Sequence, residues 1–367
     1  KNKNILMQYF VYISFGFLCF QLFNVLINFL FRQAIAKTEI QNNDLISVLI
    51  PARNEENNIA RLLDALQKLN NNIEILVCND HSTDKTEEII SRYQTTDQRI
   101  RLIESEVLPK GWLGKNHACY QLAKQASGKY LLFIDADVVI SGNIIADAVS
   151  YAKKHKLGLL SVFPKQVLLT TGEKKAVPLM NYILLTLLPL IFVRMSPFKS
   201  HTAANGQFML FESKTYFELE PHKQFKNSAV EDIAISKFYK KQKIKIACLI
   251  GEERIQCRMY DSYKDALNGF SKNIFMFFGN SPIVAFLFWV FVTLGIVPII
   301  FYNINLILIY LLGVLLIQFL YAIICRQSII ITIVYFPANM FFMLRVMINA
   351  LIIKKQKNYL WKGRNIY

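Results

Sequence analysis

Residues 130–139 read YLLFIDADVV, an apolar run that ends in two aspartates one residue apart. An apolar run of this length and composition predicts a buried strand. A solvated turn would explain the two aspartates on their own, because Asp is a common turn residue. Alternation along a strand would instead aim both carboxylates to one side, where they could hold Mg²⁺ or Mn²⁺ beside a diphosphate. The surrounding sequence has to separate these two interpretations.

Strands and amphipathic helices alternate around this stretch. LISVLIPARNEE (45–56), IEILVCNDHSTDKT (73–86) and LGLLSVFP (157–164) each begin with a buried strand pattern. Such alternation predicts an α/β fold with a largely parallel sheet, in which ligands bind beyond the carboxyl ends of the strands. Polar clusters follow three of these strands, at 53–56, 79–84 and 135–137. The sequence therefore predicts one crevice that all three clusters line.

The composition indicates membrane spans beside this α/β part. The chain has 367 residues, of which 53% are hydrophobic, and a formal net charge of +16. No charged residue occurs from position 4 to 31, which is longer than a bilayer crossing requires. The stretch is also too long for a signal peptide, and no small-residue cleavage site follows it. We therefore expect residues 1–33 to be an uncleaved membrane anchor.

A second apolar region covers 274–353. It predicts two spans near 283–302 and 305–325 that form a hairpin, whereas 329–353 is either a third span or a re-entrant or in-plane element. The basic tail at 354–367 and the basic middle region should both stay cytoplasmic, which favours an even number of crossings after the middle region. We therefore expect an integral protein of the bacterial inner membrane with its catalytic domain, 41–273, in the cytoplasm.

The basic charge indicates lipid rather than nucleic acid. Lysines and arginines are interspersed with carboxylates in the middle region and cluster beside the apolar segments, as attraction to anionic headgroups explains. The apolar segment 178–195 allows two interpretations. It is either a buried core helix or an interfacial segment that frames an entrance for a lipid substrate.

Five motifs in order resemble glycosyltransferase family 2 over about residues 45–273. They are IPARNEE (50–56), NDHSTDKT (79–86), DAD (135–137), VEDIAIS (230–236) and QCRMY (256–260). A membrane-bound branch of this family, the diaponeurosporenoate glucosyltransferases and hopene-associated glycosyltransferases, is similar at three further places. These are GWLGKNHACYQLA (111–123), RMYDSYKDALNGFSKN (258–273) and WKGRNIY (361–367).

The resemblance implies a GT-A fold, a nucleotide-sugar donor such as UDP-glucose, a divalent metal (Mn²⁺ or Mg²⁺) and inversion at the anomeric carbon. It implies that Pro51, Arg53 and Glu55 line the nucleoside pocket, with Asp80 on the base and Asp135 on the ribose. Lys115 would lie near the phosphates and Asp137 would bind the metal. Glu231 and Asp232 match the catalytic pair in which the aspartate is the base, although they would also suit the first turn of a helix.

The chain departs from the family at one motif. Processive members carry Gln-x-x-Arg-Trp, whereas here one residue separates Gln256 from Arg258 and Met259 replaces the tryptophan. The role of Gln256 is therefore open. Arg258 is the better candidate for a diphosphate contact, because a planar guanidinium pairs well with phosphate oxygens.

These observations predict an inverting, metal-dependent transferase that moves one sugar to a membrane-embedded lipid or polyene such as a carotenoid. A polyprenyl-phosphate sugar transferase or a polysaccharide synthase is the alternative enzyme. A membrane scaffold that binds a nucleotide without turnover is the alternative of another class.

Overall fold

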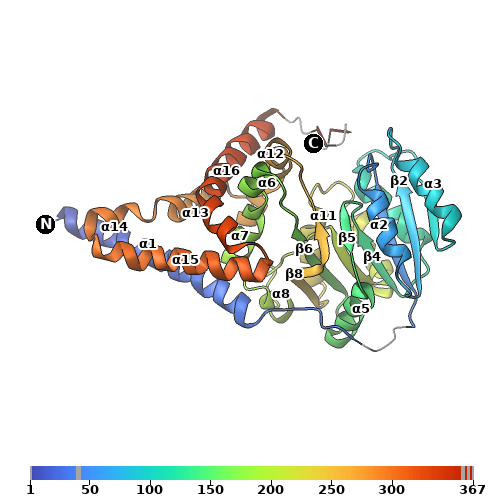
Figure 1. The fold of residues 1–367 in the computed structure, drawn as a ribbon, viewed down its shortest axis with the longest axis horizontal. Helices are drawn as coiled ribbons and strands as arrows, with labels where there is room; N and C mark the ends of the chain where they lie inside the picture. The colour runs from blue at the N-terminus through green and yellow to red at the C-terminus, as the bar shows by residue number, and fades with distance from the viewer. Residues whose placement is uncertain (1, 39–42, 357–359, 362–363, 366–367) are drawn as a thin grey trace.

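The computed structural model describes residues 2–38, 43–356, 360–361 and 364–365. These residues form an α/β body and an arm of apolar helices that tapers away from it, with the N-terminus at the tip of the arm (Figure 1). The fold class that the sequence predicts, an α/β domain with apolar helices at both ends, is confirmed.

The body is built on one eight-stranded sheet in the order β3-β2-β1-β4-β7-β6-β8-β5. β3, β2, β1 and β4 are parallel to one another, β6 is parallel to β8, and β7 and β5 run antiparallel to the strands beside them. The strands are β1 (Ile46–Ala52), β2 (Ile73–Asn79), β3 (Ile100–Glu104), β4 (Tyr130–Ile134), β5 (Val138–Ile140), β6 (Leu159–Gln166), β7 (Phe208–Glu212) and β8 (Ile246–Cys257). A short ribbon, β9 (Leu360–Trp361) and β10 (Arg364–Asn365), lies near the C-terminus.

The opening stretch, residues 130–139, forms two strands rather than one. β4 ends at Ile134 and β5 begins at Val138, and β5 pairs with β8 at the far edge of the sheet. Asp135 and Asp137 therefore lie in the turn between two strands, where the chain leaves the centre of the sheet. The predicted alternation along a single strand is wrong, but the position at the carboxyl end of β4 is confirmed.

Amphipathic helices cover the sheet. In α2 the residues Ile59, Leu62, Leu63 and Leu66 are buried at helical spacing, as the sequence pattern predicts. The helices of the body are α2 (Ile59–Gln67), α3 (Thr86–Thr96), α4 (Gly114–Gln125), α5 (Ile144–His155), α6 (Thr171–Ala176), α7 (Pro178–Leu187), α8 (Ile191–Met195), α9 (Ser213–Leu219), α10 (Pro221–Gln224), α11 (Glu231–Lys241), α12 (Tyr263–Ser271) and the 3₁₀ helix η1 (Ile274–Phe278).

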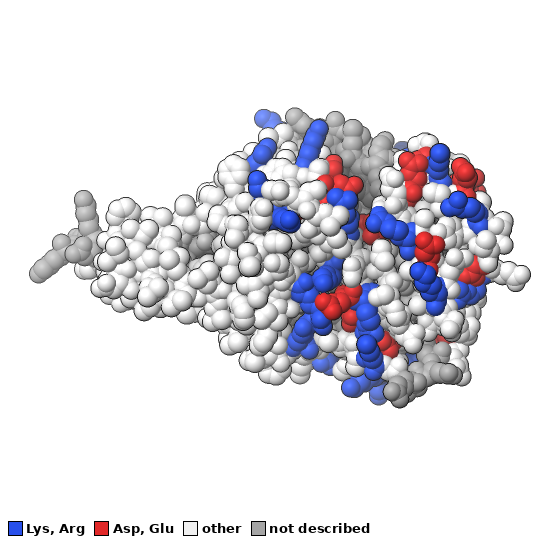
Figure 2. Space-filling model, in the orientation of Figure 1, with Lys and Arg blue, Asp and Glu red and all other residues white. Residues whose placement is uncertain are grey.

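The arm consists of α1 (Asn2–Leu30), α13 (Pro282–Leu294), α14 (Val297–Tyr302) and α15 (Asn305–Cys325). It exposes many large apolar side chains, among them Tyr9, Phe23, Phe301 and Leu308. Figure 2 shows charged residues on the body, while the tapering arm shows none on the same face. Large exposed apolar patches mark contact with a membrane or another protein. A helix also satisfies its own backbone hydrogen bonds, so these apolar helices suit a lipid environment.

In the part of the chain that the structure describes, three helices are long and apolar enough to cross a membrane. They cover 5–30, 305–325 and 329–355. The segment expected to form a span at 283–302 is instead two shorter helices, α13 and α14, which still run outward along the arm while α15 returns (Figure 1).

α16 (Ile329–Gln356) is one continuous helix with Pro337 inside it. The helix is thus uninterrupted, and whether it is a third span or a re-entrant or in-plane element stays a prediction. α16 lies at the base of the arm, where it packs against α6, α7 and α12 of the body and against α13 and α15 (Figure 1). Half of the basic and aromatic tail predicted at 354–367 lies outside the described residues, at 357–359, 362–363 and 366–367.

α1 is joined to the body through a polar face. Asn24 Nδ2 donates to Thr186 O at 2.9 Å, and Asn28 Nδ2 donates to Leu185 O and Leu188 O, both at 3.0 Å. Residues 178–186 of α7 are all buried by the protein itself, as the core-helix interpretation predicts. Where the whole segment 178–195 lies relative to a bilayer stays a prediction.

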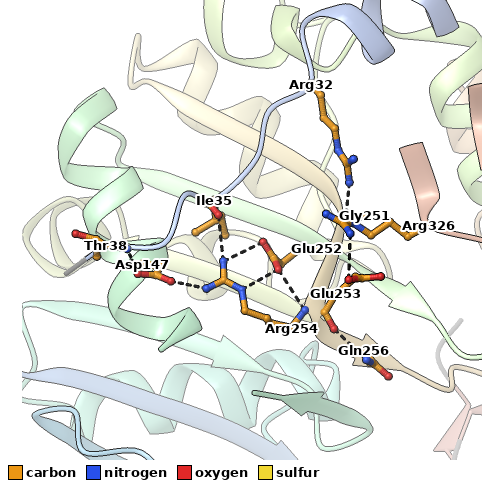
Figure 3. Close-up of polar contacts among 10 residues, drawn as sticks. All are labelled: Arg32, Ile35, Thr38, Asp147, Gly251, Glu252, Glu253, Arg254, Gln256 and Arg326. Atoms are coloured by element: carbon orange, nitrogen blue, oxygen red, sulfur yellow. Dashed lines mark hydrogen bonds and ion pairs between the residues drawn. The ribbon is translucent and has the colours of Figure 1, made fainter. Parts of the chain in front are cut away.

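The chain segments that follow α1 and α15 are both bonded to one strand, β8 (Figure 3). Arg32, beyond α1, donates to Gly251 O at 3.0 Å, and Arg326, beyond α15, pairs with Glu253 at 3.0 Å. Gly251 has φ +74°, and a Cβ there would lie 2.0 Å from Ile324 O, so only glycine allows this close approach. Because β8 runs on toward the pocket described below, the arm and the site share one rigid element.

Arg254 fastens the segment between α1 and β1 to the body (Figure 3). Its guanidinium donates to Ile35 O at 3.0 Å and pairs with Glu252 at 2.9 Å and with the buried carboxylate of Asp147. Asp147 also accepts from Thr38 N at 2.9 Å. Nearly every oxygen of this carboxylate pair is thus satisfied, as a buried charge requires.

Candidate active site

A cavity of about 310 Å³ opens beyond the carboxyl ends of β1, β2 and β4. Its size lies at the lower end of the range for small-molecule sites. Nine of the predicted site residues line it: Pro51, Arg53, Glu55, Asp80, Lys115, Asp135, Asp137, Glu231 and Asp232. The three polar clusters that follow the predicted strands therefore meet in one crevice, as the α/β pattern predicts.

The loops after β1 and β2 brace one another at one end of the cavity. Arg53 Nη1 donates to Asp80 O at 2.6 Å and to His81 O at 3.1 Å, and Asp80 N donates to Ala52 O at 2.8 Å. Glu55 N donates to Thr86 Oγ1 at 2.7 Å. These bonds fix the backbones of the two loops relative to each other, so the position of Asp80 in the cavity is well defined.

Lys115 bridges the acidic groups in the middle of the cavity. It lies in the first turn of α4, and its Nζ is 2.7 Å from Asp135 Oδ1 and 3.5 Å from Glu231 Oε1. Burial acts to lower the pKa of Lys115, but Asp135 and Glu231 outweigh burial and raise it well above its ordinary value. This lysine therefore stays charged and holds β4 and α11 together.

Asp137 carries an oxygen that lacks a partner among the described residues. Its Oδ1 is buried without a hydrogen bond, its Oδ2 accepts a 3.4 Å bond from Gln207 Nε2, and the Cys257 thiol also interacts with this carboxylate. Burial, together with the charges of Asp135 and Glu55, raises the pKa of Asp137 to about 7. An unsatisfied carboxylate among other carboxylates is a place where a cation is favourable.

The residues present fit a divalent metal of the Mg²⁺ or Mn²⁺ type. Both ions prefer oxygen ligands, and Asp137 supplies an unpaired one. The described residues hold no group of three or more His, Cys, Asp or Glu side chains arranged around a metal. A metal here would depend on one or two carboxylates plus oxygens of a bound phosphate and water, which is the usual arrangement for Mg²⁺.

Glu231 and Asp232 begin α11 and differ in their electrostatics. Asp232 Oδ2 accepts from Gly206 N at 3.0 Å, and its Oδ1 accepts from Ile233 N at 2.7 Å. Burial and the neighbouring Glu231 raise the pKa of Asp232 to about 7. Burial acts in the same direction on Glu231, but Lys115 and Lys272 outweigh it and lower the pKa of Glu231. Two adjacent carboxyl groups with separated pKa values are typical of acid–base sites.

Arg258 and Gln256 do not line this cavity. The guanidinium of Arg258 is bound to Glu173, at 2.6 Å, and lies 3.5 Å from Asp261. Gln256 is exposed on β8 and donates to Glu253 O at 2.9 Å. In this structure Arg258 is engaged by Glu173 outside the cavity lining, so the diphosphate contact by Arg258 stays a prediction.

Sequence reasoning missed the apolar wall and a second lysine. Phe163, Met180, Met259, Tyr260, Phe270 and Phe277 line the cavity on the side of α7, α12 and η1. Tyr260 stacks edge-on against Phe270, and it fits because Gly269 has no side chain: a Cβ there would lie 2.1 Å from Tyr260 Oη. Lys272 and Asn273 also line the cavity. Several of these residues belong to the motif RMYDSYKDALNGFSKN (258–273), but the sequence analysis gave them no role in the site.

Comparisons with known proteins agree with this geometry. Residues 47–217 match the profile of Glycosyl transferase family 2. A 4,4'-diaponeurosporenoate glycosyltransferase of Staphylococcus haemolyticus (strain JCSC1435) is 27% identical over 242 residues, which are 65% of this chain and 63% of that protein. The match thus spans less than two thirds of that relative's length. The protein of the same name from Staphylococcus aureus (strain USA300) is 27% identical over 271 residues, 71% of this chain and 69% of its own.

One solved structure shares the fold over nearly the whole chain. The mannosyltransferase PcManGT from Pyrobaculum calidifontis, solved with GDP-Man and Mn²⁺, covers 95% of this chain and 98% of its own with a TM-score of 0.56. Its sequence identity is 13%, so this likeness concerns the fold alone.

Proposed function

We propose that the chain is a glycosyltransferase of family 2 and that it moves one sugar from a nucleotide-sugar donor to a carotenoid-type or other polyene lipid in the membrane, as the family profile and the names of the relatives support. One observation carries the proposal. Asp80, Asp137 and Asp232 come from three separate motifs and line a single cavity that apolar and aromatic side chains also line. In such a cavity a polar donor and an apolar acceptor could bind next to each other.

The donor would occupy the wall made by β1, β2 and β4. We propose that Pro51, Arg53, Glu55 and Asp80 form the nucleoside end and that Asp135 contacts the ribose, as the family resemblance implies. We further propose UDP-glucose as the donor. Lys115, which stays charged beside Asp135, would face the diphosphate.

A divalent ion, Mn²⁺ or Mg²⁺, held by Asp137 and the donor's diphosphate would neutralise charge on the leaving nucleotide. Asp232 is the proposed base, because its two oxygens are fixed by the backbone N–H groups of Gly206, before β7, and Ile233, in the first turn of α11. The acceptor oxygen forms its bond to the anomeric carbon as the bond from that carbon to the diphosphate breaks. Attack from the face opposite the nucleotide inverts the configuration.

The proton balance depends on the acceptor. An alcohol would give its proton to Asp232, which must be ionised to take it. A carboxylic acid is already ionised near neutral pH, since its ordinary pKa is about 4. The name of the relatives, a diaponeurosporenoate glycosyltransferase, supports the acid as acceptor for this chain.

We propose that residues 41–273 form a cytoplasmic catalytic domain at the inner membrane, with α1 and the α13–α15 hairpin crossing the bilayer. The position of α16 at the base of the arm supports an in-plane role for this helix (Figure 1). The basic residues near the arm would then face anionic headgroups.

The test uses the full chain in vesicles. We would supply UDP-glucose, Mn²⁺ and a polyene acid and analyse the lipids by mass spectrometry. The proposal predicts a product that has gained one hexose, with Asp137→Asn and Asp232→Asn variants as comparisons. A product with several sugars, or transfer to polyprenyl phosphate, would favour the alternative enzymes instead. Donor binding without any product would favour a scaffold.

A further inference from the structure

Lys272 stands at the boundary between the acidic and apolar walls of the cavity. It follows the last residue of α12, and it lines the cavity with Asn273, Tyr260, Phe270 and Phe277. Burial and the charge of Lys115 lower the pKa of Lys272, whereas Glu231, Asp232 and Asp135 act in the opposite direction.

The end of α12 is held from the membrane side. Ser271 Oγ accepts from Asn349 Nδ2 at 2.9 Å and donates to Leu267 O at 2.6 Å, and a longer bond joins it to Val346 O at 3.4 Å. Asn349 and Val346 belong to α16. The residue before Lys272 is therefore fixed by the helix at the base of the arm, so this lysine has a defined position on the side from which a membrane lipid would enter.

Three buried polar atoms of this cavity lack a hydrogen-bond partner among the described residues. Two, Asp137 Oδ1 and Gln207 Oε1, lie on the donor side. The third is Asn273 Oδ1, next to Lys272. An amide group can present either its oxygen or its nitrogen by turning over, so Asn273 can donate to an oxygen atom bound there. An unpaired polar atom on an otherwise apolar wall indicates a polar group of the substrate at that place.

An acidic acceptor needs a cation at this place. Glu231 and Asp232 both line the cavity, and a carboxylate brought beside them would be repelled. Among the described cations that line the cavity, Lys272 is the one next to the apolar residues.

Resting on the proposed function, we infer that Lys272, assisted by Asn273, binds the carboxylate of the acceptor and selects acids over alcohols. The polyene chain lies along the aromatic wall, while the carboxylate oxygen that does not react is held by the ammonium group. The reacting oxygen is thereby turned toward the donor sugar. Lys272 is thus a specificity-determining residue rather than the base.

The test compares a polyene monocarboxylic acid with the primary alcohol of the same carbon chain. The full chain in lipid vesicles is used as wild type, Lys272→Met, Lys272→Arg and the control Lys264→Met, which removes an exposed lysine from the same helix. Equilibrium binding of each polyene is followed by its visible absorbance without donor. Transfer is measured with donor and Mn²⁺, and nucleotide affinity is measured separately.

Lys272→Met is expected to weaken binding and kcat/KM for the acid by about 10- to 150-fold, the worth of one hydrogen bond to a charged group. The alcohol and the nucleotide should change by less than about 3-fold, and Lys272→Arg should keep most of the preference for the acid. Equal losses for acid and alcohol, weaker nucleotide binding, or no change at all would overturn the inference. A wild type that binds the acid through Lys272 but transfers no sugar would contradict only the proposed function.

Discussion

The guanidinium of Arg258 donates two hydrogen bonds to Glu173 Oε1, at 2.6 and 2.9 Å, and the Glu173 side chain is wholly buried. The same carboxylate accepts from Thr170 N at 2.8 Å and caps α6. Arg258 therefore neutralises a buried charge and anchors the loop that carries Met259 and Tyr260 into the cavity.

Replacing Arg258 by Met should destabilise the protein while leaving donor binding intact. Removing one partner of a buried ion pair costs about 3–5 kcal/mol, because the other charge stays buried. Chemical unfolding of the full chain in detergent would measure this loss, and the Arg258→Met/Glu173→Met double variant should recover much of it. A normally stable variant whose KM for the donor rises tenfold or more would instead support a diphosphate contact.

Replacing Asp232 by Asn should separate the two classes of acceptor. With a polyene alcohol the rate should fall by about 10²- to 10⁴-fold, because the base is lost. With a polyene acid it should stay within about tenfold, because no proton has to be removed. Initial rates with both acceptors test this, and Asp261→Asn, at an exposed aspartate, is the control. Equal collapse with both acceptors would contradict a role for Asp232 limited to proton removal.

The rate with an alcohol acceptor should depend on pH through Asp232. Burial and Glu231 raise the pKa of Asp232 to about 7, so the group is protonated, and inactive as a base, below that pH. The value of kcat/KM should therefore rise about tenfold per pH unit below about 7 and level off above it. A pH profile measured at saturating donor and metal tests this, and the slope should vanish in Asp232→Asn. A flat wild-type profile from pH 5 to 8 would count against Asp232 as the base.

Replacing Arg254 by Met should loosen the segment between α1 and β1. Asp147, whose side chain is only 2% exposed, would keep its bond from Thr38 N but lose its cation. Hydrogen exchange of backbone amides in residues 32–38 should become faster, and stability should fall by about 3–5 kcal/mol. Lys165→Met, which removes a more exposed pair with Glu253, should change stability by less than about 1 kcal/mol. Unchanged exchange in Arg254→Met would show that the segment is held by other contacts.

Much of the α/β body follows from local sequence patterns. The alternation of buried strands with amphipathic helices predicts the parallel strands β1, β2 and β4, and polar residues after each strand predict the crevice. The pattern does not reveal β7, because an antiparallel strand inserted between β4 and β6 depends on contacts far apart in the sequence. The break between β4 and β5 was missed for a related reason, since Val138 and Val139 extend the apolar pattern of the preceding strand.

The candidate site was predictable where it depends on motifs and not where it depends on pairing. Asp80, Asp137 and Asp232 could be named because short polar motifs follow strands or begin a helix. The ion pair between Arg258 and Glu173 could not be predicted, because the two residues lie 85 positions apart and only the fold brings them together. Lys272 escaped notice because a single lysine after a helix usually faces solvent. The polar face Gln21, Asn24 and Asn28 of α1 could have been read from its helical spacing as a docking face.

The most direct test of the account is nucleotide binding by the wild type and Asp137→Asn, measured by titration calorimetry with and without Mn²⁺. The full chain in nanodiscs would be titrated with UDP, and Asp261→Asn would serve as the control. We predict that Mn²⁺ tightens UDP binding at least tenfold in the wild type and the control, and that Asp137→Asn loses this effect. Equal tightening in Asp137→Asn would contradict a metal-assisted diphosphate site at this carboxylate.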